Sequence, residues 1–131
     1  MHHNPEHYLD NAATTALLPE ALEEALPLLR DAYGNPSSLH PLGMEANRAI
    51  KTARERLARL IGVPPQAITF TSGATEANNL ALQGAFGPQR KAGGRLLISA
   101  IEHPSVLETA YALEARGVLV QQLPVTPEGI V

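Results

Sequence analysis

The stretch ITFTSGATEANNLAL, residues 68–82, joins two kinds of sequence pattern. Its first four residues, 68–71, are rich in β-branched and aromatic side chains, which favour a strand. Residues 74–83 carry apolar side chains at helical spacing and predict a helix. Residues 72–75, where the strand ends and the helix begins, are all small, which suits a backbone that must come close to a ligand.

The sequence after this stretch continues the same alternation. Strands are predicted at 96–100 and 118–123, with a helix between them at 104–116 that has a proline in its first turn. The order strand, helix, strand, helix, strand is typical of a parallel sheet with right-handed crossovers, so we predict an α/β fold. The strand at 96–100 is apolar enough that we expect it to be buried on both faces.

The sequence before the stretch predicts an N-terminal arm and two helices. Leucines at helical spacing predict a helix over 19–32, and Pro27 within it should kink or split it. A second helix is expected over 43–61, with Gly62 as its C-cap. We therefore divide the chain into an N-terminal arm, kinked helix and loop (1–42) and an incomplete α/β domain (43–131).

Composition argues against several classes of protein. The net charge of -3 gives no reason to expect nucleic acid as a partner. No apolar run approaches the ~18 to 20 residues that span a membrane, and no signal-peptide pattern is present, so we expect a cytoplasmic protein. There is no cysteine, which excludes disulfides and thiolate metal sites. Although His2, His3 and His7 invite a metal interpretation, we expect an ordinary frayed terminus and no metal.

Small polar residues follow the first predicted strand, at the edge of the sheet where parallel α/β folds bind ligands. At Ser72–Thr75 this edge coincides with a helix N-terminus, where unpaired N–H groups and the helix dipole favour a phosphate. Gly73 and Ala74 let the backbone close on such a group, and Ser72 and Thr75 offer hydroxyl donors. The alternative is a plain helix cap, because Ser and Thr are favoured at that position.

His103 follows the second predicted strand, and by the same geometry we expect it beside the Ser72–Thr75 turn. An imidazole at that position can stack on a planar ring or transfer a proton near neutral pH. The alternative is that His103 only caps the helix begun by Pro104. Two polar clusters on one edge favour a shared site.

Four motifs occur in order along the chain: YLDNAATT (8–15), GNPSSLH (34–40), FTSGATEANNLAL (70–82) and EHPSVLET (102–109). Together they resemble the N-terminal part of cysteine desulfurases of the NifS/IscS type, in the class V aminotransferase group. The resemblance implies a partial large domain of the fold-type I architecture that binds pyridoxal 5'-phosphate (PLP). It also implies conversion of L-cysteine to L-alanine, with the sulfur passed to an enzyme cysteine for iron–sulfur cluster or thio-cofactor assembly.

The resemblance also assigns roles to individual residues. Ala74 and Thr75, next to Gly73, are expected to contact the PLP phosphate, and His103 to stack on the pyridine ring and take part in proton transfer. The loop 11–15 and the loop around Asn35 and Ser37 are expected near the substrate or a partner subunit. A homodimer and a sulfur-acceptor or scaffold protein are the implied partners.

The family also requires a lysine that forms a Schiff base with PLP, an aspartate beside the pyridine nitrogen and a sulfur-accepting cysteine, all later in the chain. Lys51 lies on a polar helix face, and Lys91 lies in a loop at the opposite edge of the sheet. We therefore expect the front portion of an enzyme, inactive by itself. The alternatives are another class V enzyme, such as an aminotransferase or selenocysteine lyase, and a non-catalytic truncated remnant that acts as a binding or dimerisation module.

Overall fold

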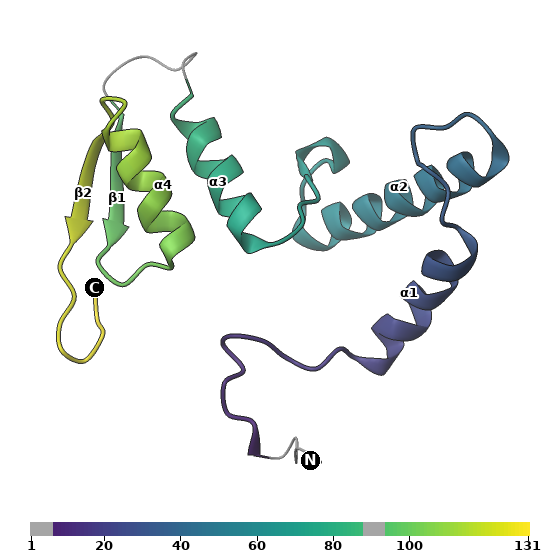
Figure 1. Cartoon of the computed structure of the whole chain (residues 1–131), viewed down its shortest axis with the longest axis horizontal. Coiled ribbons are helices and arrows are strands. Elements are labelled where there is room, and N and C mark those ends of the chain that lie inside the picture. Colours follow the sequence, from purple (N-terminus) through teal and green to yellow (C-terminus); the bar gives the residue numbers. More distant parts are fainter. Residues whose placement is uncertain (1–6, 88–93) are drawn as a thin grey trace. The chain divides into compact units, whose positions relative to one another are not determined.

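The computed structural model describes residues 7–87 and 94–131 (Figure 1). The chain forms two compact units, one ending at Ile68 and the other beginning at Thr69. The predicted division between residues 42 and 43 does not coincide with this grouping and, as a statement about the domains of the family, stays a prediction.

The first unit contains helices α1 (Pro19–Asp31) and α2 (Pro41–Ile61), followed by a short 3-10 helix, η2 (Pro65–Ala67). Helix α1 continues through Pro27, so the proline does not split it. A proline removes only its own N–H from the helical ladder, and the bonds on either side can hold. Helix α2 ends as predicted, because its C-cap Gly62 has φ 72°, in the left-handed region that favours glycine.

The GNPSSLH loop packs closely on the start of α2. His40 caps the helix by accepting a hydrogen bond from the Gly43 amide on Nδ1 at 3.4 Å. Asn47 Nδ2 donates to the Pro36 carbonyl at 3.1 Å. Gly34 has to be a glycine here, because a Cβ atom at this position would overlap the backbone of Leu42. The motif therefore has a structural role at the start of α2, whatever else it does.

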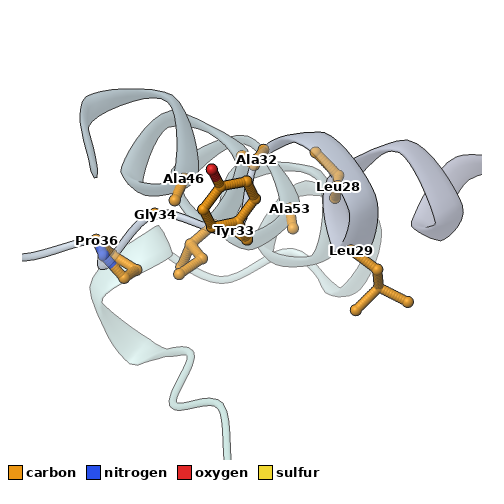
Figure 2. A pocket seen from close by; sticks show the side chains of 10 residues that line it. Leu28, Leu29, Ala32, Tyr33, Gly34, Pro36, Ala46 and Ala53 are labelled. Atoms are coloured by element: carbon orange, nitrogen blue, oxygen red, sulfur yellow. The ribbon is translucent and has the colours of Figure 1, made fainter. Parts of the chain in front are cut away.

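An apolar pocket lies between the end of α1, the following loop and α2 (Figure 2). Ala32 and Ala46 are buried at this junction. Helix α1 itself buries none of its residues in the described structure, and Leu29 is 74% exposed. The apolar stripe that predicted α1 therefore lies largely on the surface of this unit.

The second unit is an α/β arrangement in which helix and strand alternate. Its two strands are parallel, paired from Arg95 opposite Leu119 to Ser99 opposite Leu123. Figure 1 shows that the two helices of this unit, α3 (Ala74–Ala85) and α4 (Pro104–Glu114), begin at the end of the sheet where both strands finish. The parallel pair with a crossover helix confirms the predicted fold class. The elements are α3 (Ala74–Ala85), β1 (Arg95–Ser99), α4 (Pro104–Glu114) and β2 (Leu119–Leu123).

The strand predicted at 68–71 is wrong in this structure. The backbone is extended, with φ -93° and ψ 125° at Ile68, but the sheet of the described residues contains only β1 and β2. The β-branched side chains favour an extended backbone, whereas a strand also needs a neighbour that accepts its hydrogen bonds. That neighbour is not supplied by the described residues.

The core of the second unit consists of Leu96 and Ile98 from β1 and Ala110 and Leu113 from α4. Partly buried side chains pack around them, among them Leu82 of α3, its C-cap Phe86 and Val106 of α4. The prediction that β1 is buried on both faces is wrong, because Leu97 is 51% exposed. Successive side chains of a strand point to opposite faces. Only the face with Leu96 and Ile98 is covered by the helices described here.

Membrane-spanning helices and clusters of metal-binding side chains are both absent from the described residues. No helix among them is both long and apolar enough to cross a lipid bilayer. No group of three or more histidine, cysteine, aspartate or glutamate side chains lies close enough there to hold a metal ion. His2 and His3 lie outside the described residues, so the interpretation of the terminal histidines stays a prediction.

Candidate functional site

The first turn of α3 leaves backbone N–H groups at the surface. Its N-cap is Gly73, with no side-chain cap hydrogen bond, and the Ala77 amide makes a bond of 3.1 Å to the Gly73 carbonyl. The amides of Ala74 and Thr75 come before this bond, where a helix has no internal acceptor for them. Both residues are exposed. The turn therefore offers donors to a group approaching from outside.

The space above Gly73 is open in the described structure. A Cβ atom placed there would meet no other atom within 4 Å. The backbone of Gly73 is extended, with φ 166° and ψ -179°, which any residue adopts, so conformation does not demand a glycine. The described residues therefore do not require a glycine here, and a group from outside has room to approach the backbone at this position.

Glu76 holds the loop that enters α3. Its Oε2 accepts hydrogen bonds from both the amide and the hydroxyl of Ser72, each at 2.7 Å. These bonds, the backbone one above all, hold the pKa of the Glu76 carboxyl below its ordinary value of 4.5. The prediction that Ser72 offers a free hydroxyl donor is wrong in this structure, because Glu76 accepts it. An acidic residue in the first turn of a helix was the signal that sequence reasoning missed.

His103 is the N-cap of α4. Its Nδ1 accepts a hydrogen bond from the Ser105 amide at 3.1 Å and lies 2.8 Å from Ser105 Oγ. The alternative interpretation from the sequence, that His103 caps the helix begun by Pro104, is therefore confirmed as one role of this residue. It uses only one ring nitrogen, and the side chain is classed as exposed. The cap thus leaves Nε2 and the ring faces available for a second role.

Two hydrogen-bonded links hold α3 and α4 side by side near their first turns. Asn78 Nδ2 donates to Ser105 Oγ at 2.9 Å, and Thr109 Oγ1 donates to Asn79 Oδ1 at 2.9 Å. Asn79 in turn donates to the Thr75 carbonyl at 2.9 Å.

Through these links the Thr75 turn and His103 lie on the same rim of the second unit, although residues 73–75 do not follow a strand of the sheet, as the edge geometry had required. Asn78, Asn79, Ser105 and Thr109 were missed by sequence reasoning, although polar residues on otherwise apolar helix faces were a usable signal.

The other residues that the sequence singled out are not part of the rim formed by α3 and α4. Lys51 of α2 is 72% exposed, with its Nζ 4.0 Å from Glu55 Oε1, as expected for a solvated face. Lys91 lies outside the described residues. The loop 11–15 and residues Asn35 and Ser37 belong to the first unit.

Known proteins match nearly the whole chain. Cysteine desulfurase IscS of Dictyoglomus turgidum is 44% identical over 126 residues, which cover 96% of this chain and 32% of that protein. A solved structure titled NifS-like protein has a TM-score of 0.74 and 39% identity, over 88% of this chain and 32% of its own. The chain thus spans about a third of the length of these relatives.

A further structure carries a cofactor in its title. It is a C-DES mutant with glycine covalently linked to the PLP cofactor, at 28% identity and a TM-score of 0.56, covering 77% of this chain and 27% of its own. A comparison with protein families matches residues 7–131 to aminotransferase class V. Since this match runs through both units, the chain belongs to the class V aminotransferase family, and the Dictyoglomus turgidum relative is named a cysteine desulfurase.

Proposed function

We propose that this chain forms the N-terminal part of a PLP-dependent cysteine desulfurase. The observation that carries the proposal is the shared rim of α3 and α4, which carries both open amides and an imidazole, in a chain 44% identical over 126 residues to an IscS protein. In the complete reaction L-cysteine gives up its sulfur to an enzyme thiol, which leaves L-alanine and an enzyme persulfide. PLP, when bound, supplies an electron sink for this chemistry.

The residues of the first α3 turn fit the phosphate of PLP. Ala74 and Thr75 offer backbone amides at the positive end of the helix dipole, and Thr75 adds an exposed hydroxyl. Gly73 leaves the space for the phosphate oxygens free. Glu76 keeps Ser72 turned back onto the helix, so we assign the phosphate to residues 73–75 and not to Ser72.

His103 fits the role of a group that touches the cofactor ring and moves a proton. An exposed imidazole fixed through Nδ1 presents its ring face and Nε2 to a ligand on the rim. The cap on α4 removes rotational freedom from this side chain, which favours a defined orientation for proton transfer.

The rest of the function depends on residues that the matched relatives carry beyond the third that this chain spans. We propose that they supply the lysine that holds PLP, the aspartate at the pyridine nitrogen and the cysteine that accepts sulfur. We further propose a cytoplasmic homodimer that passes sulfur to an acceptor or scaffold protein.

A chimera tests the proposal. The third of Dictyoglomus turgidum IscS that this chain matches would be replaced by the chain, with the intact relative and the 131-residue chain alone as controls. We expect the chimera to retain PLP and to release alanine and sulfide from L-cysteine in the presence of a thiol reductant. We expect the chain alone to show no absorbance of lysine-bound PLP and no turnover.

Other outcomes of this experiment separate the alternatives. A chimera that retains PLP and transaminates, or that accepts only selenocysteine, would favour another class V activity. A folded chimera that retains no PLP would contradict the assignment of residues 73–75. Such a chimera would instead favour a non-catalytic binding or dimerisation module.

A further inference from the structure

The contacts of His103 distinguish the two neutral forms of its ring. A neutral imidazole carries one proton, on either Nδ1 or Nε2. The Ser105 backbone amide donates a hydrogen bond to Nδ1 at 3.1 Å. A backbone N–H has no lone pair and only donates, so Nδ1 has to be the acceptor. A proton on Nδ1 would place two hydrogens face to face.

The side chain of Ser105 supports the same form. Its Oγ lies 2.8 Å from Nδ1 and accepts a hydrogen bond of 2.9 Å from Asn78 Nδ2. Because the amide group of Asn78 supplies the donor, the hydroxyl hydrogen of Ser105 is free to point to Nδ1. The chain of donors therefore runs from Asn78 through Ser105 to His103.

The link is sheltered from water. Ser105 is only 8% exposed, and Thr109, one turn further along α4, is 5% exposed. Hydrogen bonds in such surroundings are not easily replaced by bonds to solvent, so their direction is better defined than at the surface. The polar contact of α3 with α4 thus reaches the ring of an otherwise exposed histidine.

We propose that Ser105 and Asn78 are positioning residues that hold His103 as the Nε2–H tautomer. The nitrogen that carries the proton is then the one that the helix cap does not use. The inference concerns this chain in the absence of PLP and goes beyond the proposed function. If the cofactor assignment holds, it also states which nitrogen of His103 bears the proton on the rim.

Nitrogen-15 NMR of the 131-residue chain without cofactor tests the proposal, at a pH where the ring is neutral. We expect Nδ1 to resonate as an unprotonated nitrogen, with the Nε2–H form favoured at least about tenfold. Ser105→Ala removes the hydroxyl but keeps the amide, so the preference should fall by roughly threefold to tenfold. Ser105→Thr, which restores a hydroxyl, should return it toward the original ratio.

Thr109→Val is the matched control. It removes a hydroxyl on the same helix that contacts Asn79 Oδ1 at 2.9 Å and the Ser105 carbonyl at 2.8 Å, and it leaves the Ser105 amide and hydroxyl that face His103 in place. It should leave the tautomer ratio unchanged, even if it lowers stability as much as Ser105→Ala does. Asn78→Asp, which accepts from Ser105 where asparagine donates, should shift the ratio toward Nδ1–H.

Three results would overturn the proposal. The first is that the two tautomers of His103 are about equally populated in the unaltered chain. The second is that their ratio equals that of a histidine in an unfolded peptide. The third is that Ser105→Ala and Thr109→Val change this ratio equally. Since no PLP is present, failure here leaves the cofactor assignment standing. Loss of PLP binding in the chimera would likewise leave the tautomer result standing.

Discussion

Asn78 on α3 donates a hydrogen bond of 2.9 Å to Ser105 on α4, across 27 positions of sequence. A second bond of the same length joins Thr109 to Asn79. These polar contacts bring the first turns of two parallel helices to the same rim. The candidate site is thus built on a pair of interhelical hydrogen bonds as well as on the sheet edge that sequence reasoning used.

Thr109→Val should lower the free energy of unfolding of the chain by about 1–2 kcal/mol. The single hydroxyl hydrogen has two acceptors within reach, Asn79 Oδ1 at 2.9 Å and the Ser105 carbonyl at 2.8 Å, while valine keeps nearly the same shape but has no donor. Urea unfolding of the 131-residue chain measures the change. Thr126→Val, at an exposed turn outside the helices, is the control and should cost less. Equal stability of Thr109→Val and the unaltered chain would contradict a structural role for the link.

Most of the second unit could be predicted from local pattern. Helices α3 and α4 and strands β1 and β2 lie within a few residues of their predicted ranges, because each has its own periodicity or boundary residue. Pro104 marked a helix start here, just as Gly62 marked a helix end in the first unit. Local pattern also predicted that His103 and residues 73–75 share one edge, but it relied on a paired strand at 68–71, and hydrogen bonds between α3 and α4 connect them instead.

The errors were in features that depend on distant neighbours. Residues 68–71 have the composition of a strand, but pairing depends on which segment lies beside them. The exposed face of Leu97 likewise depends on what covers the sheet. The bonds of Glu76 to Ser72 and of Asn78 to Ser105 depend on side-chain rotamers and helix packing, which periodicity does not encode.

Replacing neighbouring residues of β1 should show its one-sided burial. Ile98→Ala should cost about 2–5 kcal/mol in the free energy of unfolding, because Ile98 is 5% exposed and packs in the core. Leu97→Ala, the matched control on the opposite face at 51% exposure, should cost under about 1 kcal/mol. Urea unfolding compares the two. Similar losses would indicate that the face of Leu97 is covered in solution.

Thr75→Val should weaken PLP binding in the chimera by roughly tenfold to a hundredfold. The change removes a hydroxyl donor to a dianion, and hydrogen bonds to charged groups contribute about 1.5–3 kcal/mol. Equilibrium titration of the cofactor-free chimera with PLP measures the affinity. Thr75→Ser keeps the hydroxyl and should bind nearly as well as threonine. Unchanged affinity of the valine variant would count against Thr75 as a phosphate ligand.

His103→Ala should slow desulfuration by the chimera far more than it weakens PLP retention, if the imidazole transfers protons. A positioned general acid–base group contributes typically about 10² to 10⁴ in rate. Alanine also removes the cap of α4, so His103→Asn is the necessary control, because asparagine is a good N-cap but has no imidazole. Both variants should be slow in single-turnover assays. Recovery of the rate by asparagine would assign His103 a capping role alone.

Glu76 should titrate below its ordinary pKa of 4.5, because the Ser72 amide and hydroxyl both donate to its carboxylate. A lowered pKa in the folded chain means that the ionised form is favoured by folding. Its contribution to stability is therefore complete above the unfolded pKa and is lost as the pH falls through the lower folded value.

The carboxyl carbon resonance of Glu76, followed by NMR over acidic pH, gives the midpoint directly. Ser72→Ala should raise this midpoint only part of the way toward 4.5, because the amide bond, the larger cause of the shift, remains. Glu76→Gln should keep the loop closed, since its side-chain oxygen still accepts from the Ser72 amide, but should show no titration. A midpoint at or above 4.5 in the unaltered chain would mean that the loop entering α3 is not held by Glu76 in solution.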